Sequence, residues 1–142
     1  MSTVFTRIIA GELPGRFIWE DEICVGFLSI SPLSYGHALV VPRQEIDRWT
    51  DADVDLVAHL MRVAHRIGKA QVETFGSRRA GLTIAGYEVD HLHIHVWPSN
   101  SMEDFDFAQA IADPDQQEMD EAGERLRVAL RLMGDTGFVP AD

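Results

Sequence analysis

Cysteine is nearly absent from this chain, which has 142 residues and a single thiol, at Cys24. One cysteine excludes an internal disulfide and any zinc site built on paired cysteines. The thiol stands between aliphatic residues in the segment EICVGFL. That setting is typical of a small buried apolar side chain rather than of a nucleophile.

Basic residues and long apolar segments are also scarce. The chain has 12 Lys and Arg against 23 Asp and Glu, which gives a net charge of −11. This balance excludes the broad electrostatic attraction by which proteins bind nucleic acids or anionic membranes. No apolar run approaches the ~20 residues that cross a bilayer, and the N-terminus lacks the pattern of a secretory signal. We therefore expect a cytoplasmic protein with no nucleic-acid partner and no membrane partner.

The hydrophobic pattern predicts a single α+β domain over residues 1–142. Strands that stand before and after one long helix, without repeated βαβ units, favour an antiparallel sheet. The long helix is predicted from residue 50 or 51 to about residue 75, because apolar residues recur there at helical spacing. The strands are expected at residues 17–19, 23–30, 38–41, 80–85 and 91–97, and shorter helices at 2–10, near 105–111 and at 120–133.

Three of the six histidines stand on alternate residues in the segment HLHIHVW, residues 91–97. In a strand, His91, His93 and His95 face one side, and the aliphatic residues between them face the other side. Pro98 is expected to end this strand. The polar face of an otherwise ordinary amphipathic strand is therefore made entirely of imidazole.

Three interpretations account for this imidazole face. The first is a solvated strand that happens to be rich in histidine. The second is a zinc site shared with a remote ligand such as His37, although His91 and His95 lie about 13 Å apart in an extended strand, too far to bind one ion without distortion. The third is a phosphate site, in which a neutral imidazole attacks phosphorus and its neighbours bind the non-bridging oxygens. The third best explains three histidines in a row, with His93, flanked on both sides, as the nucleophile.

The sequence resembles the histidine triad (HIT) family over roughly residues 4–98. HLHIHVW fits the family signature, His-x-His-x-His followed by aliphatic residues. IIAGELP resembles the opening helix and turn, SPLSYGHALVVPR the Gly-His strand, and AGYEVDHLHIHVWP the Ala-Gly turn that enters the triad. Residues 99–142 correspond to a segment that varies within the family.

The resemblance implies a sheet of about five antiparallel strands with one long helix, in a homodimer that needs no cofactor. The implied activity is hydrolysis or transfer at the α-phosphate of a purine nucleotide, such as a phosphoramidate or a dinucleoside polyphosphate. A non-catalytic nucleotide-binding or sensor module is the alternative, and a histidine-ligated metal hydrolase is a further one. Thr3 and Thr6 stand where zinc-binding members carry two cysteines, so no metal site is expected.

The resemblance also assigns roles to particular residues. His93 is the catalytic nucleophile that forms a nucleotidyl-histidine intermediate, His95 binds the phosphate, and His91 orients the nucleophile. The remaining candidates contact the nucleotide: His37, Ser29, Phe5, Ile9, Phe27, Ile30, Gly86 and Glu88.

Four positions depart from the family pattern. Ser29 stands where many members carry the Asp or Asn that holds the ribose, and Glu45 stands where some carry a further histidine. Tyr87 and Glu88 follow the Ala-Gly pair, where other members have Gln and then Ser or Thr. Three placements are open for Glu88: an inward carboxylate that repels the phosphate, a protonated carboxyl that donates a proton to the leaving group, or a carboxylate that faces solvent. We expect the last, because a carboxylate beside a turn is usually solvated.

Overall fold

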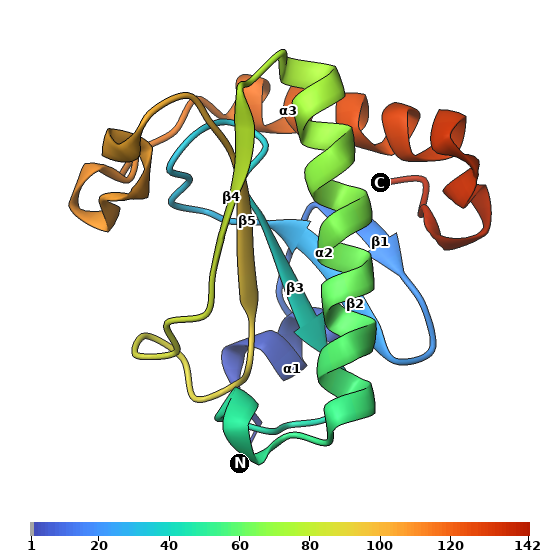
Figure 1. Cartoon of the computed structure of the whole chain (residues 1–142). Coiled ribbons are helices and arrows are strands. Elements are labelled where there is room, and N and C mark those ends of the chain that lie inside the picture. Colours follow the sequence, from blue (N-terminus) through green and yellow to red (C-terminus); the bar gives the residue numbers. More distant parts are fainter. Residues whose placement is uncertain (1) are drawn as a thin grey trace.

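A computed structural model describes residues 2–142 as one antiparallel sheet with helices packed around it (Figure 1). The sheet has five strands in the order β1-β2-β3-β5-β4, and every neighbouring pair is antiparallel. This confirms the predicted α+β fold. The strands are β1 (Phe17–Glu20), β2 (Cys24–Leu28), β3 (Ala38–Pro42), β4 (Arg79–Thr83) and β5 (Ile94–Ser99).

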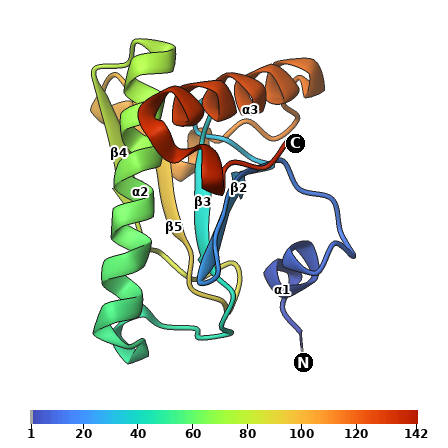
Figure 2. The ribbon, with the colours of Figure 1, turned by 90° about the vertical axis from the view of Figure 1, so that its right-hand side faces the viewer.

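Helices lie on both faces of the sheet. The long helix α2 runs along one face and the short helix α1 lies on the opposite side, whereas α3 crosses one end of the sheet (Figure 2). No helix among residues 2–142 is long and apolar enough to cross a membrane. The helices are α1 (Val4–Ile9), α2 (Val54–Phe75) and α3 (Gln116–Leu130), with short turns at Trp49–Asp51, Met102–Phe105, Phe107–Gln109, Arg131–Asp135 and Thr136–Phe138.

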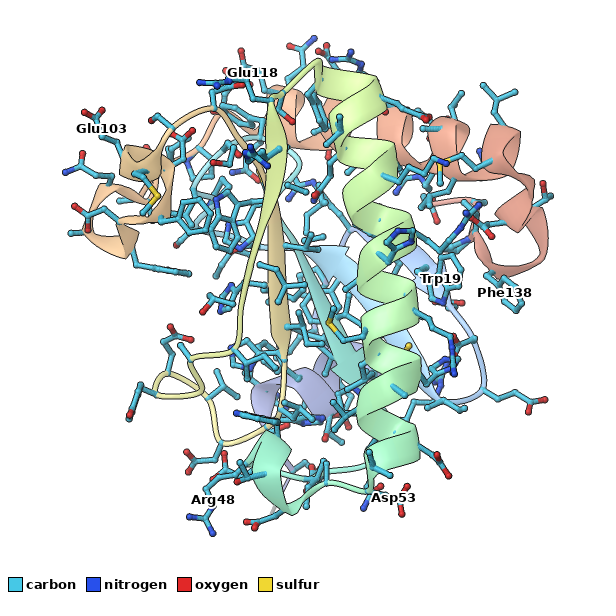
Figure 3. All side chains as sticks on the ribbon, viewed as in Figure 1. Trp19, Arg48, Asp53, Glu103, Glu118 and Phe138 are labelled. Carbon is cyan, nitrogen blue, oxygen red and sulfur yellow. The ribbon has the colours of Figure 1, made fainter. Side chains whose placement is uncertain are left out.

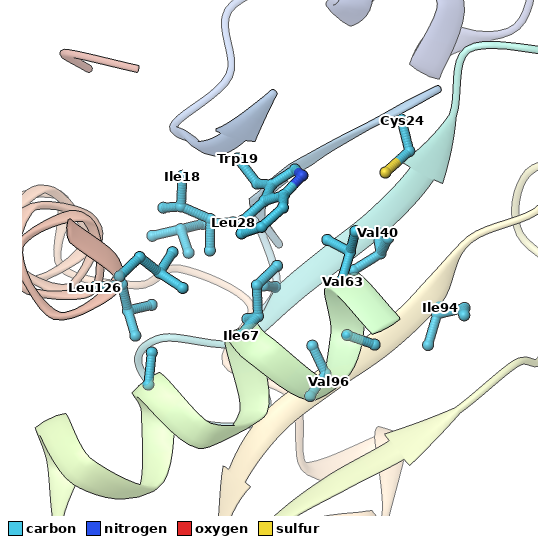
Figure 4. Packing of buried hydrophobic residues seen from close by; sticks show 14 of the residues in the cluster. Ile18, Trp19, Cys24, Leu28, Val40, Val63, Ile67, Ile94, Val96 and Leu126 are labelled. Atoms are coloured by element: carbon cyan, nitrogen blue, oxygen red, sulfur yellow. The ribbon is translucent and has the colours of Figure 1, made fainter. Parts of the chain in front are cut away.

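The main core fills the space between α2, α3 and the sheet (Figure 4). The buried stripe of α2 follows helical spacing, and it packs on strand side chains that alternate along β3 and β5. The aliphatic residues of the triad segment, Leu92, Ile94 and Val96, are at most 2% exposed and belong to this core. Their burial places the three histidines on the opposite face of the sheet, as the alternation predicts.

A second, smaller cluster lies on the histidine side of the sheet. Phe5 of α1 packs there against Phe27 with ring centroids 5.6 Å apart. Phe27 pairs with Leu39 across β2 and β3, and Leu39 in turn pairs with His95 on β5. This register places the histidine face next to an apolar surface of β2 and β3, and α1 packs on that surface.

The helices α2 and α3 begin at residues other than those predicted. The α2 helix begins at Val54, capped by Asp53, because residues 49–51 form a separate 3-10 turn. Gly76, at φ +64°, ends it as predicted. The α3 helix begins at Gln116 rather than at residue 120, because Asp115 accepts a hydrogen bond from the Glu118 N–H at 2.9 Å.

The boundaries of the triad strand also differ from the prediction. β5 begins at Ile94 rather than at residue 91, and it continues through Pro98, which pairs with Ala80. The Pro98 carbonyl accepts a hydrogen bond from the Ser34 hydroxyl at 2.6 Å, away from β4. N–H and C=O of one strand residue point to the same side, so the missing N–H of Pro98 costs no bond with β4.

The C-terminal third is packed onto the sheet. Phe138 stacks on Trp19 of β1, with ring centroids 5.0 Å apart and planes 18° apart (Figure 3). Arg127 of α3 donates a hydrogen bond from Nη1 to the Phe17 carbonyl at 2.8 Å. These contacts join the segment after β5 to the edge strand β1.

Candidate active site

A cleft of about 780 Å³ opens on the histidine side of the sheet. This volume falls in the range of small-molecule binding sites. Its walls come from α1, the loop before β1, the end of β2, the loop before β5 and the C-terminal third. The residues lining it are Val4, Phe5, Ile8, Pro14, Gly15, Arg16, Phe27, Leu28, Ser29, Ile30, Ser31, His37, Leu39, Glu88, Val89, His93, His95, Phe107, Ala110, Gln116 and Asp120.

His93 lies in this cleft with one nitrogen fixed by the backbone. Its Nδ1 is 2.7 Å from the His91 carbonyl oxygen. A carbonyl only accepts hydrogen bonds, so Nδ1 carries the proton and Nε2 keeps its lone pair. The Phe5 ring packs edge-on against the imidazole with centroids 4.9 Å apart. The nitrogen with the lone pair is therefore held in a defined direction beside the cleft.

His91 lies behind His93 and does not line the cleft. Its Nε2 donates to the Pro42 carbonyl at 2.8 Å, and its Nδ1 accepts from the Thr3 hydroxyl at 2.6 Å. Burial lowers the pKa of His91 below its ordinary value and keeps the ring neutral. His91 thus ties the entry of β5 to the end of β3 and to the cap of α1, while its own carbonyl orients His93.

His37 and His95 form a chain of hydrogen bonds that starts at the backbone. The Leu33 N–H donates to Nδ1 of His37 at 2.9 Å, so the proton of this neutral ring is on Nε2. That Nε2 lies 3.0 Å from Nδ1 of His95 and donates to it. The proton of His95 is consequently on Nε2, beside the cleft.

His37 and His95 are both neutral near pH 7. Burial, followed by the neighbouring His95, lowers the pKa of His37 to about 3. Burial, followed by the neighbouring His93, lowers the pKa of His95 to about 4. Within residues 2–142, His95 Nε2 is buried and has no hydrogen-bond partner. A buried donor without a partner is costly, so this N–H is suited to a ligand oxygen that enters the cleft.

The expectation that Glu88 faces solvent is wrong in part. Its side chain is 56% exposed, yet Oε2 lies 3.3 Å from His93 Nε2 and 4.0 Å from His95 Nε2. The loop that carries it turns at Gly86, whose φ of +84° is a conformation that glycine adopts without strain. This turn brings the carboxylate over the histidines instead of away from them.

The structure gathers most of the predicted nucleotide-binding residues in the cleft. Phe5, Phe27, Ser29 and Ile30 line it together with the residues described above. Two candidates do not line it. Ile9 packs against the smaller apolar cluster, and its neighbour Ile8 faces the cleft instead. Gly86 shapes the loop of Glu88, and a Cβ added at this glycine would meet nothing within 4 Å.

The C-terminal third supplies a part of the cleft that was not predicted from the sequence. The Phe107 ring packs edge-on against His95 with centroids 5.1 Å apart. Arg16 donates from Nε to Asp120 at 2.8 Å and from Nη2 to the Gln116 side chain at 2.9 Å. Arg16 and Asp120 are 104 positions apart, and no local pattern predicts such a pair. An aromatic residue in an otherwise polar segment was the available signal for Phe107.

Within residues 2–142, two clusters have the composition of a metal site. In one, the ligand atoms of Glu88, His93 and His95 all lie within 4.8 Å of one another. Zinc binds the unprotonated nitrogen of a histidine, and the chain from Leu33 through His37 places a proton on the His95 nitrogen that would have to bind. This cluster is therefore better prepared for an anionic oxygen than for a cation.

The other cluster is Asp21, Cys24 and His59. Its carboxylate already accepts hydrogen bonds from the Trp19 indole and from His59, both at 2.8 Å, and from two backbone N–H groups. These bonds lower the pKa of Asp21 to about 2, against the opposing effect of burial, which is the largest single influence. The carboxylate organises the turn between β1 and β2 and has no free position for an ion.

Comparison with known proteins identifies the family. Residues 10–102 match the model of the HIT domain. A zinc-bound histidine triad family protein from Mycobacterium smegmatis has 32% sequence identity and a TM-score of 0.83, over 96% of this chain and 98% of that one. The adenosine 5'-monophosphoramidase HNT1 of Saccharomyces cerevisiae is 32% identical, over 67% of this chain and 61% of its own length. The adenylylsulfatase HINT3 of Arabidopsis thaliana is 33% identical, over 67% of this chain and 51% of its own length. The chain belongs to the histidine triad family.

Proposed function

We propose that the chain is a hydrolase or nucleotidyl transferase that acts at the α-phosphate of a purine nucleotide. The observation that carries this proposal is the pair of opposite tautomers in the cleft. His93 presents a lone pair on Nε2, and His95 presents an N–H on Nε2. A nucleophile beside a hydrogen-bond donor is the arrangement that phosphoryl transfer through a covalent intermediate needs.

In the first step, Nε2 of His93 attacks the α-phosphorus, and the bond from phosphorus to the leaving group breaks. The N–H of His95 donates to a non-bridging oxygen of the phosphoryl group. As His93 gains positive charge, its Nδ1–H donates more strongly to the His91 carbonyl. Water then attacks the phosphorus, the P–N bond breaks, and the nucleoside monophosphate is released.

The nucleoside is assigned to the apolar part of the cleft. Phe5, Phe27 and Ile30 supply flat and aliphatic surfaces on which a purine can pack. The Ser29 hydroxyl lies at the end of β2 and is the candidate contact to the ribose. Arg16 is the one Lys or Arg among the lining residues, and its charge is already paired with Asp120.

The two named relatives support the choice of substrate class. One is an adenosine 5'-monophosphoramidase and the other an adenylylsulfatase, so both names describe an adenylate that carries a leaving group. We propose adenosine phosphoramidates as the first substrates to test, with dinucleoside polyphosphates next. Beyond the cleft itself, we propose a cytoplasmic homodimer that requires no metal. Light scattering of the purified protein measures its oligomeric state.

A nucleotide-binding module with little catalysis is the second candidate. Ser29 and Glu88 favour it. A serine reaches less far toward a ribose than the Asp or Asn of many family members, and a carboxylate repels a phosphate. The geometry of His93 supports the enzyme instead. Binding alone does not require an imidazole whose Nδ1–H is fixed by a backbone carbonyl, so that Nε2 keeps its lone pair beside the cleft.

Mass spectrometry of the intact protein tests the enzyme. The protein is mixed with an adenosine phosphoramidate and quenched in alkali, because a phosphorus–nitrogen bond to histidine is labile in acid. We expect an added adenylate on the wild type and none on His93→Ala, with AMP released later. His65→Ala is the matched control, since His65 is exposed on α2. Binding of AMP without adduct or turnover would favour the binding module.

A further inference from the structure

The Glu88 carboxylate lies beside the proposed nucleophile of the cleft. Its carboxylate oxygen lies 3.3 Å from His93 Nε2, the atom proposed to attack phosphorus. Nδ1 of His93 already donates to the His91 carbonyl, so one additional proton must lie between Nε2 and Oε2 for these two atoms to form a hydrogen bond. The contact therefore places an ionisable oxygen within proton-transfer distance of the nucleophile.

Among the described residues that line the cleft, no other group is placed to exchange a proton with a substrate. Burial keeps His37 and His95 neutral, and the N–H of His95 is fixed by the chain from Leu33. Arg16 stays protonated in proteins and is paired with Asp120 at 2.8 Å. Serine hydroxyls are too weakly acidic for this role. Glu88 combines an ionisable oxygen with a position above both nucleophile and phosphate-binding nitrogen.

We propose that Glu88 is the general acid and base of the reaction, an inference that rests on the proposed function. In the reactive state Glu88 carries a proton, and His93 Nε2 keeps the lone pair with which it attacks. The bond from Nε2 to phosphorus forms, the bond from phosphorus to the leaving atom breaks, and the proton of Glu88 passes to that atom. Glu88 is then a carboxylate facing the cationic nucleotidyl-histidine.

The second step restores the proton. Water attacks the phosphorus and loses its proton to the Glu88 carboxylate. The new oxygen–phosphorus bond forms as the bond to His93 Nε2 breaks, and the lone pair returns to Nε2. Glu88 ends protonated beside a neutral imidazole, which is the state in which the cycle began. In this cycle an ionisable group acts at the position where other members of the family carry Ser or Thr.

The charge of the cleft agrees with this role. A carboxylate beside an anionic phosphate is unfavourable, whereas a protonated carboxyl can donate to it. A protonated Glu88 therefore suits a bound anionic phosphate, and a carboxylate suits the cationic adduct that follows. The half-exposed side chain also lets water reach the oxygen in the hydrolytic step.

The test compares two leaving groups with different needs for a proton. An adenosine 5'-phosphoramidate of an alkylamine requires protonation of the departing nitrogen. Adenosine 5'-(4-nitrophenyl) phosphate releases a stable phenolate without it. For Glu88→Gln we expect the single-turnover rate of His93 adenylylation to fall about 10²–10⁴-fold with the alkylamine and less than about tenfold with the nitrophenyl ester. Glu88→Asp keeps an acid at a shorter reach and should fall between wild type and Gln with the amine.

Asp90→Asn is the matched control, because Asp90 is an exposed carboxylate of the same loop and the same charge is removed. It should react like wild type with both substrates. Equal losses on both substrates in Glu88→Gln would overturn the proposal, since they would mark a residue that binds or positions substrate. Unchanged rates on both would also overturn it. A wild type that forms no adduct with either compound would instead contradict the proposed function, on which this role depends.

Discussion

His37 Nε2 lies 3.0 Å from His95 Nδ1, and this contact decides which nitrogen of His95 carries a proton. The direction of this hydrogen bond follows from the other nitrogen of His37. The Leu33 N–H donates to Nδ1 of His37, so Nε2 carries the proton and donates to His95. A backbone donor thus determines, through two buried imidazoles, that an N–H faces the cleft. His37 acts on the ligand through His95 and is a positioning residue in the proposed reaction.

Removing His37 should weaken catalysis by freeing the tautomer of His95. For His37→Ala we expect kcat to fall about 10–100-fold, less than the loss of a complete oxyanion donor, because His95 itself remains. His37→Gln can place an amide N–H near the lost Nε2 and should recover part of the loss. Steady-state kinetics measures kcat and KM separately, with His65→Ala as the control. An unchanged kcat in His37→Ala would show that the tautomer of His95 does not depend on this contact.

Stability should decrease as the pH falls below about 6.5. His37 and His95 take up protons near their ordinary pKa of 6.5 when unfolded, but only near about 3 and about 4 when folded. Between these values the unfolded state holds more protons, so acid favours unfolding. Each histidine contributes at most about 1.4 kcal/mol per pH unit in this window.

Urea unfolding at about pH 7 and about pH 5 measures this dependence. The change in the free energy of unfolding should be smaller for His37→Gln than for wild type, because one of the two buried histidines is gone. Carboxylates contribute equally to both proteins and cancel in the comparison. Equal changes in the two proteins would mean that His37 takes up protons as readily in the folded state as in the unfolded state.

Gly36 is predicted to tolerate no side chain. Its φ is +98°, and an added Cβ would lie 2.8 Å from Phe75 Cζ and closer still to Cε2. Gly11 has a similar φ of +81° and open space around it, so Gly11→Ala is the matched control for backbone strain alone. We expect Gly36→Ala to destabilise the protein by about 1–3 kcal/mol more than Gly11→Ala, as overpacking does. Thermal unfolding compares them, and equal losses would contradict the steric explanation.

Chelation of metal ions should leave the activity intact. The proton on His95 Nε2 opposes binding of a cation between Glu88, His93 and His95. We expect wild-type protein incubated with excess EDTA, then freed of it, to keep its rate on the phosphoramidate. Metal content is measured by mass spectrometry on the same samples. Loss of activity that added zinc restores would support the metal hydrolase interpretation.

Much of the fold follows from local sequence patterns. Alternation in HLHIHVW places Leu92, Ile94 and Val96 in the core and the histidines on the other face. Glycine at the end of α2 and threonine at the start of α1 act as the caps that their residue types favour. Boundaries were less well predicted. The Pro98 prediction was wrong because the cost of a missing N–H depends on which side of the strand has a neighbour.

The sequence by itself determined the family, the α+β class and the histidine face, because these depend on residue types at short spacings. Only the tertiary structure decided the protonation pattern and the walls of the cleft. The proton on His95 depends on Leu33, 62 positions away along the chain, and the Arg16 to Asp120 pair joins residues 104 positions apart. The Glu88 carboxylate meets His93 because a glycine turns the loop back over the sheet. Such contacts are set by how distant segments pack, which no local pattern encodes.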